Sequence, residues 1–218
     1  MEILDWLFVG LLSAAILFVL LAILFFVIWI KNSGKLKKNR KRRPSKRNKK
    51  KWMRLNARFK KRAQKARNRF VLILVLAGVF FAGGFYIRYY QSTNLDVKDQ
   101  EALVQGYFII DELEQRIEAI SDTDNPQKDL ATIYDLSARL ANYGARVPNS
   151  RLSKEGKVIM SQLFDRMKRL GLNLSGISLK QLQEEEIRNS YIEDISKVQG
   201  SQEKAFEFYR IKESSLKK

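Results

Sequence analysis

The apolar residues of this chain follow two different patterns. Residues 6–30 and 70–87 are long stretches of apolar or small residues without a charged side chain. From residue 91 onward, apolar residues instead recur every three or four positions, which is the spacing of amphipathic helices. No segment alternates apolar and polar residues between turn residues, as strands do. The pattern therefore predicts an all-α protein with two continuous apolar helices and a separate helical region.

The two apolar stretches are long enough to be transmembrane helices. Residues 6–30 would extend about 37 Å as a helix, more than the ~30 Å hydrocarbon core of a bilayer. Residues 70–90 form a shorter second span that ends in Arg88 and two tyrosines, which suit the headgroup layer. A cleaved signal peptide is an alternative for the first span. However, Glu2 and Asp5 replace the positive charge expected before it, and no small-residue cleavage site follows.

The charge between these stretches predicts their orientation. Residues 31–69 hold 21 Lys or Arg and no Asp or Glu, whereas the whole chain has a net charge of +18. The positive charge is therefore local, and such a short basic loop stays on the cytoplasmic side. We expect a multi-pass protein of the cell membrane, with residues 1–5 and 91–218 both extracytoplasmic.

The basic loop has two parts. Residues 31–50 contain almost only Lys, Arg, Asn, Ser and Gly, and are predicted to be disordered when free. Residues 51–69 form a basic amphipathic helix that runs into the second span, and we expect it to lie flat on the inner leaflet. Trp52 and Phe59 would insert among the lipids. The residues predicted to contact anionic lipid are Trp52, Arg54, Arg58, Phe59, Lys60, Lys61, Arg62 and Lys65.

Three roles are open for this basic loop. The simplest role is a topology determinant held against anionic lipid, since each cation near such a surface contributes about 1 kcal/mol. A second role is specific recognition of an anionic lipid or a partner. A third is binding of nucleic acid or the ribosome through phosphate contacts, although no recognised nucleic-acid-binding motif accompanies the cations.

Each span also carries two small residues four positions apart. These pairs are Gly10 with Ala14 and Gly78 with Ala82. Small residues allow helix backbones to approach closely, so the pairs are candidate packing positions in the membrane. Ordinary use of glycine and alanine in membrane helices is the alternative.

Residues 91–218 are predicted to form a bundle of four to five helices. Asn125 before Pro126 and Ser178 before Gln181 are start signals for helices. Three glycines follow apolar periodic segments and are predicted to end helices. They are Gly144, Gly171 and Gly200. Because residues 91–98 contain neither Gly nor Pro, we expect the first helix of the bundle to continue stiffly from the second span.

The composition gives little support to catalysis. The chain has no Cys and no His, which removes disulfides, thiolates and the commonest general base. Asp122, Asp124 and Asp129 do not fit a calcium-binding EF-hand, because Gln127 and Ile133 occupy positions that need Gly and Glu. The acidic run 184–186 is typical of a solvated helix start. No catalytic residue, metal ligand or cofactor is predicted.

These features favour a non-enzymatic two-pass membrane protein. We expect an accessory or scaffold subunit of a bacterial cell-envelope complex for secretion, conjugation, cell-wall synthesis or division. Its partners would be anionic lipids and other membrane proteins, while the oligomeric state stays open. Two alternatives are a membrane-bound sensor whose external helices bind a ligand, and a membrane-tethered binder of nucleic acid or ribosomes. A membrane-bound enzyme is the least favoured class.

Overall fold

The computed structural model describes residues 2–41, 44, 48–213 and 216, and these residues contain seven α-helices and no strand. The chain divides into two compact units, Met1–Arg88 and Tyr89–Lys218. The predicted all-α class is therefore confirmed for the described part of the chain.

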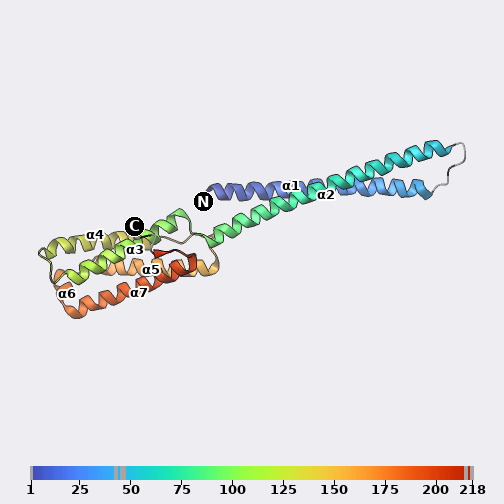
Figure 1. The fold of residues 1–218 in the computed structure, drawn as a ribbon. Helices are drawn as coiled ribbons and strands as arrows, with labels where there is room; N and C mark the ends of the chain where they lie inside the picture. Colours follow the sequence, from blue (N-terminus) through green and yellow to red (C-terminus); the bar gives the residue numbers. More distant parts are fainter. Residues whose placement is uncertain (1, 42–43, 45–47, 214–215, 217–218) are drawn as a thin grey trace. The chain divides into compact units, whose positions relative to one another are not determined.

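The N-terminal unit is a hairpin of two long helices. α1 comprises Glu2–Lys41 and α2 comprises Lys49–Thr93, and the two run antiparallel side by side (Figure 1). Aromatic rings of the two helices are in contact. The ring centroids of Phe18 and Phe80 lie 5.2 Å apart, and those of Phe26 and Phe70 lie 5.3 Å apart. Each helix contains an apolar segment long enough to cross a membrane. Length and composition thus agree with the two predicted spans.

Within residues 31–50, which were predicted to be disordered, residues 31–41 belong to α1. The helix does not end after Ile30 but continues to Lys41. Two causes explain the extension: Lys, Arg and Leu have high helix propensity, and a span that is already helical removes the cost of nucleation. Pro44 lies between the helices, and residues 42–43 and 45–47 lie outside the described residues.

The C-terminal unit consists of four long helices and one short helix around a single core. They are α3 (Val97–Ala119), α4 (Pro126–Gly144), α5 (Lys154–Leu174), α6 (Leu179–Gln183) and α7 (Glu185–Tyr209). α5 packs against α4 and α7, and α3 packs against the same two helices (Figure 1). The largest fully buried side chains belong to Leu103, Ile110, Leu113, Ile117, Ile120, Ile133, Leu140, Met160, Leu163, Phe164, Met167 and Leu174.

Local start signals behave as predicted. The Asn125 side chain accepts a hydrogen bond from the Lys128 N–H, and Pro126 occupies the first turn of α4. Ser178 and Gln181 form the complete capping box of α6. Both motifs satisfy N–H groups that have no partner within the helix, which is why short-range sequence signals identify them.

Of the three predicted stop glycines, only Gly144 ends its helix, whereas Gly171 and Gly200 lie inside α5 and α7. None of the described glycines has a positive φ, and Gly200 lies inside the continuous α7. A Cβ atom on Gly144 would lie 2.3 Å from the Lys168 amide nitrogen, and one on Gly171 would lie 2.5 Å from the Ser137 carbonyl oxygen. Gly144 and Gly171 therefore permit the close crossing of α4 and α5, and only Gly144 also stands at a helix end.

The predicted stiff passage into the bundle is also wrong. α2 ends at Thr93, and α3 begins at Val97. The Asn94 side-chain amide donates to the Tyr90 carbonyl at 3.0 Å, and the Asp96 carboxylate accepts from the Asp99 N–H at 2.8 Å. These polar side chains end one helix and start the next, so neither Gly nor Pro is needed for a break.

Candidate functional site

The basic end of the N-terminal hairpin is held together by specific hydrogen bonds. The Trp52 indole Nε1–H donates to the Asn39 carbonyl at 2.9 Å. The Asn39 side-chain amide donates to Asn56 Oδ1 at 3.0 Å. Because both bonds join α1 to α2 near the ends of the helices, they hold the basic end as a defined hairpin.

Most of the apolar stripe of residues 51–69 faces α1, although Leu55 is 38% exposed. Trp52 and Phe59 are half-buried, and Ala63 and Ala66 are buried. Among the described residues of the N-terminal unit, α1 is the helix that can cover them. The face predicted to enter the inner leaflet is thus occupied by the basic extension of α1. The expected flat position on the membrane also conflicts with the continuity of α2, because a helix without a break cannot lie along a surface and then cross it.

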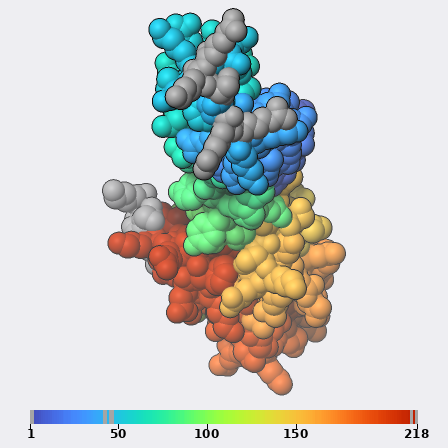
Figure 2. Space-filling model, turned by 90° about the vertical axis from the view of Figure 1, so that its right-hand side faces the viewer, coloured from blue at the N-terminus to red at the C-terminus, as the bar shows by residue number. Residues whose placement is uncertain are grey.

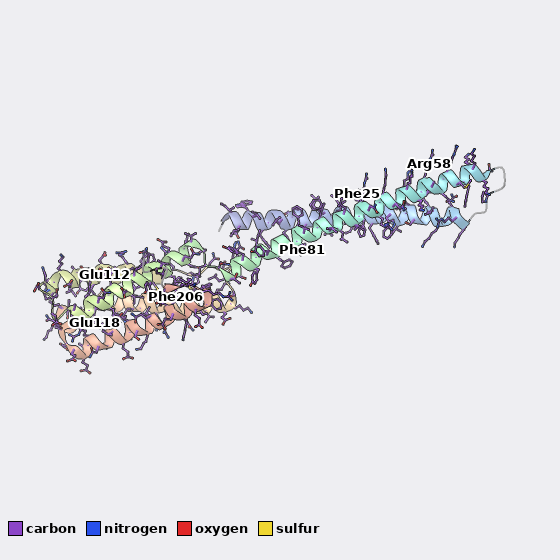
Figure 3. The ribbon with its side chains drawn as sticks, in the orientation of Figure 1. Phe25, Arg58, Phe81, Glu112, Glu118 and Phe206 are labelled. Atoms are coloured by element: carbon purple, nitrogen blue, oxygen red, sulfur yellow. The ribbon has the colours of Figure 1, made fainter. Side chains whose placement is uncertain are left out.

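The cations of this segment point outward. Six predicted lipid-contact residues are exposed, and Arg58 is seen near the basic end of α2 (Figure 3). They are Arg54, Arg58, Lys60, Lys61, Arg62 and Lys65. Residues 31–69 contain no carboxylate that could neutralise them. The result is a rod with an apolar seam inside and a positive surface.

Sequence reasoning missed the contribution of α1 to this surface. Lys35, Lys38 and Asn39 line a hollow of about 250 Å³ together with Phe59 of α2. The missed signal is Leu36 with Asn39, which are half-buried at helical spacing within a stretch of Lys and Asn. Such a weak pattern predicts a paired helix only when the partner helix is known.

The small-residue pairs lie outside the contact between α1 and α2. A Cβ atom on Gly10 or on Gly78 would meet nothing within 4 Å. Ala82 is exposed, and Ala14 is half-buried. The close approach occurs instead at Gly83, where a Cβ would lie 3.4 Å from Leu11 Cδ1. The hairpin is therefore packed mainly by aromatic rings and alanines.

A second polar cluster lies in the C-terminal unit. Asp99 is only 3% exposed, and its carboxylate accepts from the Asn149 N–H at 3.0 Å. The Asn149 side-chain amide donates to Asp96 Oδ2 at 2.8 Å. Burial raises the pKa of Asp99 from 3.8 to about 6, and the charge of Asp96 adds to the rise, while the Asn149 N–H and Arg146 oppose it.

This cluster fastens the loop of residues 145–153. The Ser153 N–H donates to the Ser92 carbonyl at 3.0 Å, and the loop lies against the end of α2 and the start of α3 (Figure 2). The Tyr209 hydroxyl is buried nearby without a hydrogen-bond partner, and burial and the charge of Asp99 raise its pKa to about 12. These groups join four segments, and we assign them a structural role.

The acidic clusters singled out in the sequence give no metal site. Asp129 accepts from Arg116 at 2.8 Å and from the Thr123 hydroxyl at 2.6 Å, so its oxygens are already engaged. Glu185 and Glu186 lie in the first turn of α7, where acids are favoured. Within the described ranges, no group of three or more His, Cys, Asp or Glu could hold a metal ion.

Comparison with known proteins adds no relative. The chain matches no protein-family model, no curated protein and no solved structure. Its geometry and charge are therefore the basis for a functional assignment.

Proposed function

We propose that this protein is a non-enzymatic two-pass membrane protein that serves as an accessory or scaffold subunit of a cell-envelope complex. The basic hairpin lies in the cytoplasm, and the bundle of four to five helices lies outside the membrane. The observation that carries the proposal is the run of 21 cations without an acidic residue between two apolar helices. Secretion, conjugation, cell-wall synthesis and division are the processes that this arrangement suits.

The distribution of apolar side chains supports the membrane assignment. Large residues on both long helices face away from the hairpin, such as Leu20 and Leu72, each 62% exposed. Exposed apolar area costs about 25 cal/mol per Å² in water, so this surface supports placing the two helices in a hydrocarbon environment. Cytoplasmic placement of the basic end then follows from the positive-inside rule.

The chemistry of the C-terminal unit supports a role in binding rather than catalysis. The chain has neither His nor Cys. Its most perturbed carboxyl, Asp99, is buried and holds Asn149, so it is not presented to a substrate. Exposed apolar side chains such as Val147 (87%) and Val158 (56%) offer contacts for a partner protein.

A ligand sensor is the second candidate function. It is favoured by a hollow of about 320 Å³ that is lined partly by Tyr89, Ser92, Ser153 and Tyr209. Hydroxyl groups and aromatic rings in one hollow suit a small polar ligand. A cytoplasmic hairpin without a folded output domain favours the scaffold.

Labelling of introduced thiols tests the topology. Because the chain has no Cys, Lys50→Cys and Val147→Cys would each create a single thiol. A membrane-impermeant maleimide should label Val147→Cys in intact cells, and Lys50→Cys only after the cells are opened. Labelling of Lys50→Cys in intact cells would refute the proposed orientation.

Crosslinking in cells tests the scaffold role. A photo-crosslinking amino acid at Val147 or Val158 should capture partners of the C-terminal unit, and Leu20, which faces lipid, is the matched control position. Specific recovery of subunits of a membrane complex is the expected result. Capture of only a second copy of the chain would indicate a self-standing homo-oligomer, and specific release by a small ligand would favour the sensor.

A further inference from the structure

We propose that the basic end of the hairpin stands away from the membrane and binds the phosphate backbone of a double-stranded nucleic acid without reading its sequence. This inference rests on the cytoplasmic orientation proposed above, and it adds a function that the scaffold role does not require. It follows from the reach of the hairpin, from the arrangement of its cations and from the packing of its aromatic rings.

The hairpin reaches beyond the electrostatic influence of the membrane surface. Aromatic contacts of Trp29 and Phe26 with Phe70 mark the inner end of the two spans. α2 continues without a break from Phe70 back to Lys49, a length of about 31 Å at 1.5 Å per residue. The Debye length at physiological salt is about 8 Å. Cations near Lys49 are therefore too far from the headgroups of an upright hairpin to bind them.

The cations of α2 form a continuous row along one side of the helix. Successive members are three or four positions apart, so they share a face at about one charge per turn. The row consists of Lys51, Arg54, Arg58, Arg62, Lys65 and Arg69. It adjoins the seam of Trp52 and Phe59 and extends over about 27 Å, because eighteen residues separate its ends.

α1 adds a second positive row across the seam. Lys31, Lys35 and Lys38 are four and three positions apart, and all three are exposed. Lys35 and Lys38 line the hollow above Phe59, so cations of one helix lie beside the ring of the other. Two parallel positive rows on a stiff rod match a duplex, which carries a negative charge about every 1.7 Å along its axis.

The aromatic rings indicate which anionic partner fits. Single-stranded nucleic acids stack their bases on exposed aromatic rings. Here Trp52 donates to the Asn39 carbonyl, and Phe59 is half-buried against α1. With the rings turned inward, cations remain as the main outward feature. Such a surface favours the regular phosphates of a duplex over unpaired bases.

Binding can be measured with the full-length protein in nanodiscs of zwitterionic lipid. The probes are a fluorescent 20-base-pair RNA duplex, the corresponding DNA duplex and the single-stranded RNA. We expect both duplexes to bind more tightly than the single strand. The logarithm of the association constant should fall with the logarithm of the salt concentration. We expect a slope of about −4.5 or steeper, which is the value for five phosphate contacts. The RNA and DNA arms show which source of phosphate is preferred.

Matched triple variants locate the contact. Lys51→Gln, Arg54→Gln and Arg58→Gln remove three charges from the distal half of the row, while Arg62→Gln, Lys65→Gln and Arg69→Gln remove three from the proximal half. The distal variant should lose at least tenfold in affinity and flatten the salt slope by about 2.7. The proximal variant should lose clearly less. An unchanged Trp52 emission spectrum, recorded with Trp6→Phe and Trp29→Phe added to each variant, verifies that the hairpin is intact in both.

Several results would overturn the proposal. Absence of duplex binding at 50 mM salt would do so directly, as would equal losses in the two variants. Displacement of the duplex by polyglutamate at equal charge would indicate an acidic polypeptide partner. Loss of duplex binding in nanodiscs with anionic lipid would indicate that the membrane surface is the true partner. Thiol labelling of Lys50→Cys tests the orientation separately, so failure of one proposal is distinguishable from failure of the other.

Discussion

The two units of this protein use the same residue types in opposite ways. In the hairpin, Leu20 and Phe81 face outward and are 62% and 41% exposed. In the C-terminal unit, Leu113 and Phe164 are 0% and 1% exposed and meet other helices. Helical spacing of apolar residues runs through the whole second unit and accompanies a core that excludes water, whereas residues 6–30 and 70–87 are apolar all round and suit a lipid environment. Whether a large apolar side chain is exposed or buried thus differs between the two units.

The charges differ in the same way. In the C-terminal unit, Arg116 pairs with Asp129 at 2.8 Å, and Arg146 pairs with Glu101 at 3.0 Å. In the hairpin, residues 31–69 have no acidic residue with which to pair. Paired charges serve the fold of their own unit, whereas a surface of one sign repels itself and is stabilised by an external anion. This contrast is the reason to seek a ligand for the hairpin.

The largest expected effect compares two phenylalanines. Phe164→Ala removes a ring from the centre of the C-terminal core and should reduce its unfolding free energy by about 3–5 kcal/mol. Phe81→Ala, in the span, should leave that unit unchanged. Hydrogen exchange of the α5 amides in the full-length protein measures both. Equal losses of protection would show that the two units do not have separate cores.

The next effect is a pH dependence caused by Asp99. Its folded pKa is about 6 and its ordinary value is 3.8, so the folded state holds the proton more tightly. Stability from this group is therefore greatest at pH below about 4 and falls by at most about 3 kcal/mol as pH rises through 6. Asp99→Asn keeps an acceptor for the Asn149 N–H and should remove this decline. Urea unfolding of a fragment of residues 89–218 at pH 4.5 and 7.5 measures the difference, and an identical pH dependence in both proteins would contradict it.

A smaller effect compares two glycines. Gly144→Ala places a Cβ against the α5 backbone and should destabilise the C-terminal unit by about 1–3 kcal/mol. Gly200→Ala meets open space inside α7 and should stabilise it by about 0.5–1 kcal/mol. Thermal unfolding of the same fragment should therefore shift in opposite directions. A loss of stability in both variants would contradict the open space found beside Gly200.

The smallest effect concerns the basic end of the hairpin. Trp52→Ala removes the hydrogen bond to Asn39 and part of the seam, and should weaken the local structure by about 1–2 kcal/mol. Trp6→Ala is the matched control, because Trp6 is 78% exposed. Hydrogen exchange at residues 35–41 and 49–60 should be faster in the first variant only. Unchanged exchange in Trp52→Ala would mean that the two helices are not joined there.

Features that depend on neighbouring residues were predictable from the sequence. The caps at Asn125 and Ser178 and the two apolar helices belong to this class. Features that depend on a second helix were not. Gly171 lies inside α5 and permits the close approach of α4. α1 continues to Lys41, and Asn39 forms a hydrogen bond with Asn56 of α2.

The candidate site follows the same division. The positions of Arg54 and Arg58 on an outward face could be predicted from helical periodicity, and both are exposed. The role of Trp52 could not, because an amphipathic helix has the same sequence pattern whether its apolar face meets lipid or another helix. The hydrogen bond from Trp52 to Asn39 distinguishes these cases.

The position of Trp52 relative to the bilayer tests the central claim most directly. Trp6→Phe with Trp29→Phe leaves Trp52 as the single tryptophan, and Trp6→Phe with Trp52→Phe leaves Trp29 as the control. Each protein is placed in vesicles with brominated lipid, which quenches nearby indoles. An upright hairpin holds Trp52 about 27 Å from Phe70 along α2, so its emission should be almost unaffected while that of Trp29 is strongly quenched. Equal quenching of the two would show that the basic segment lies on the membrane.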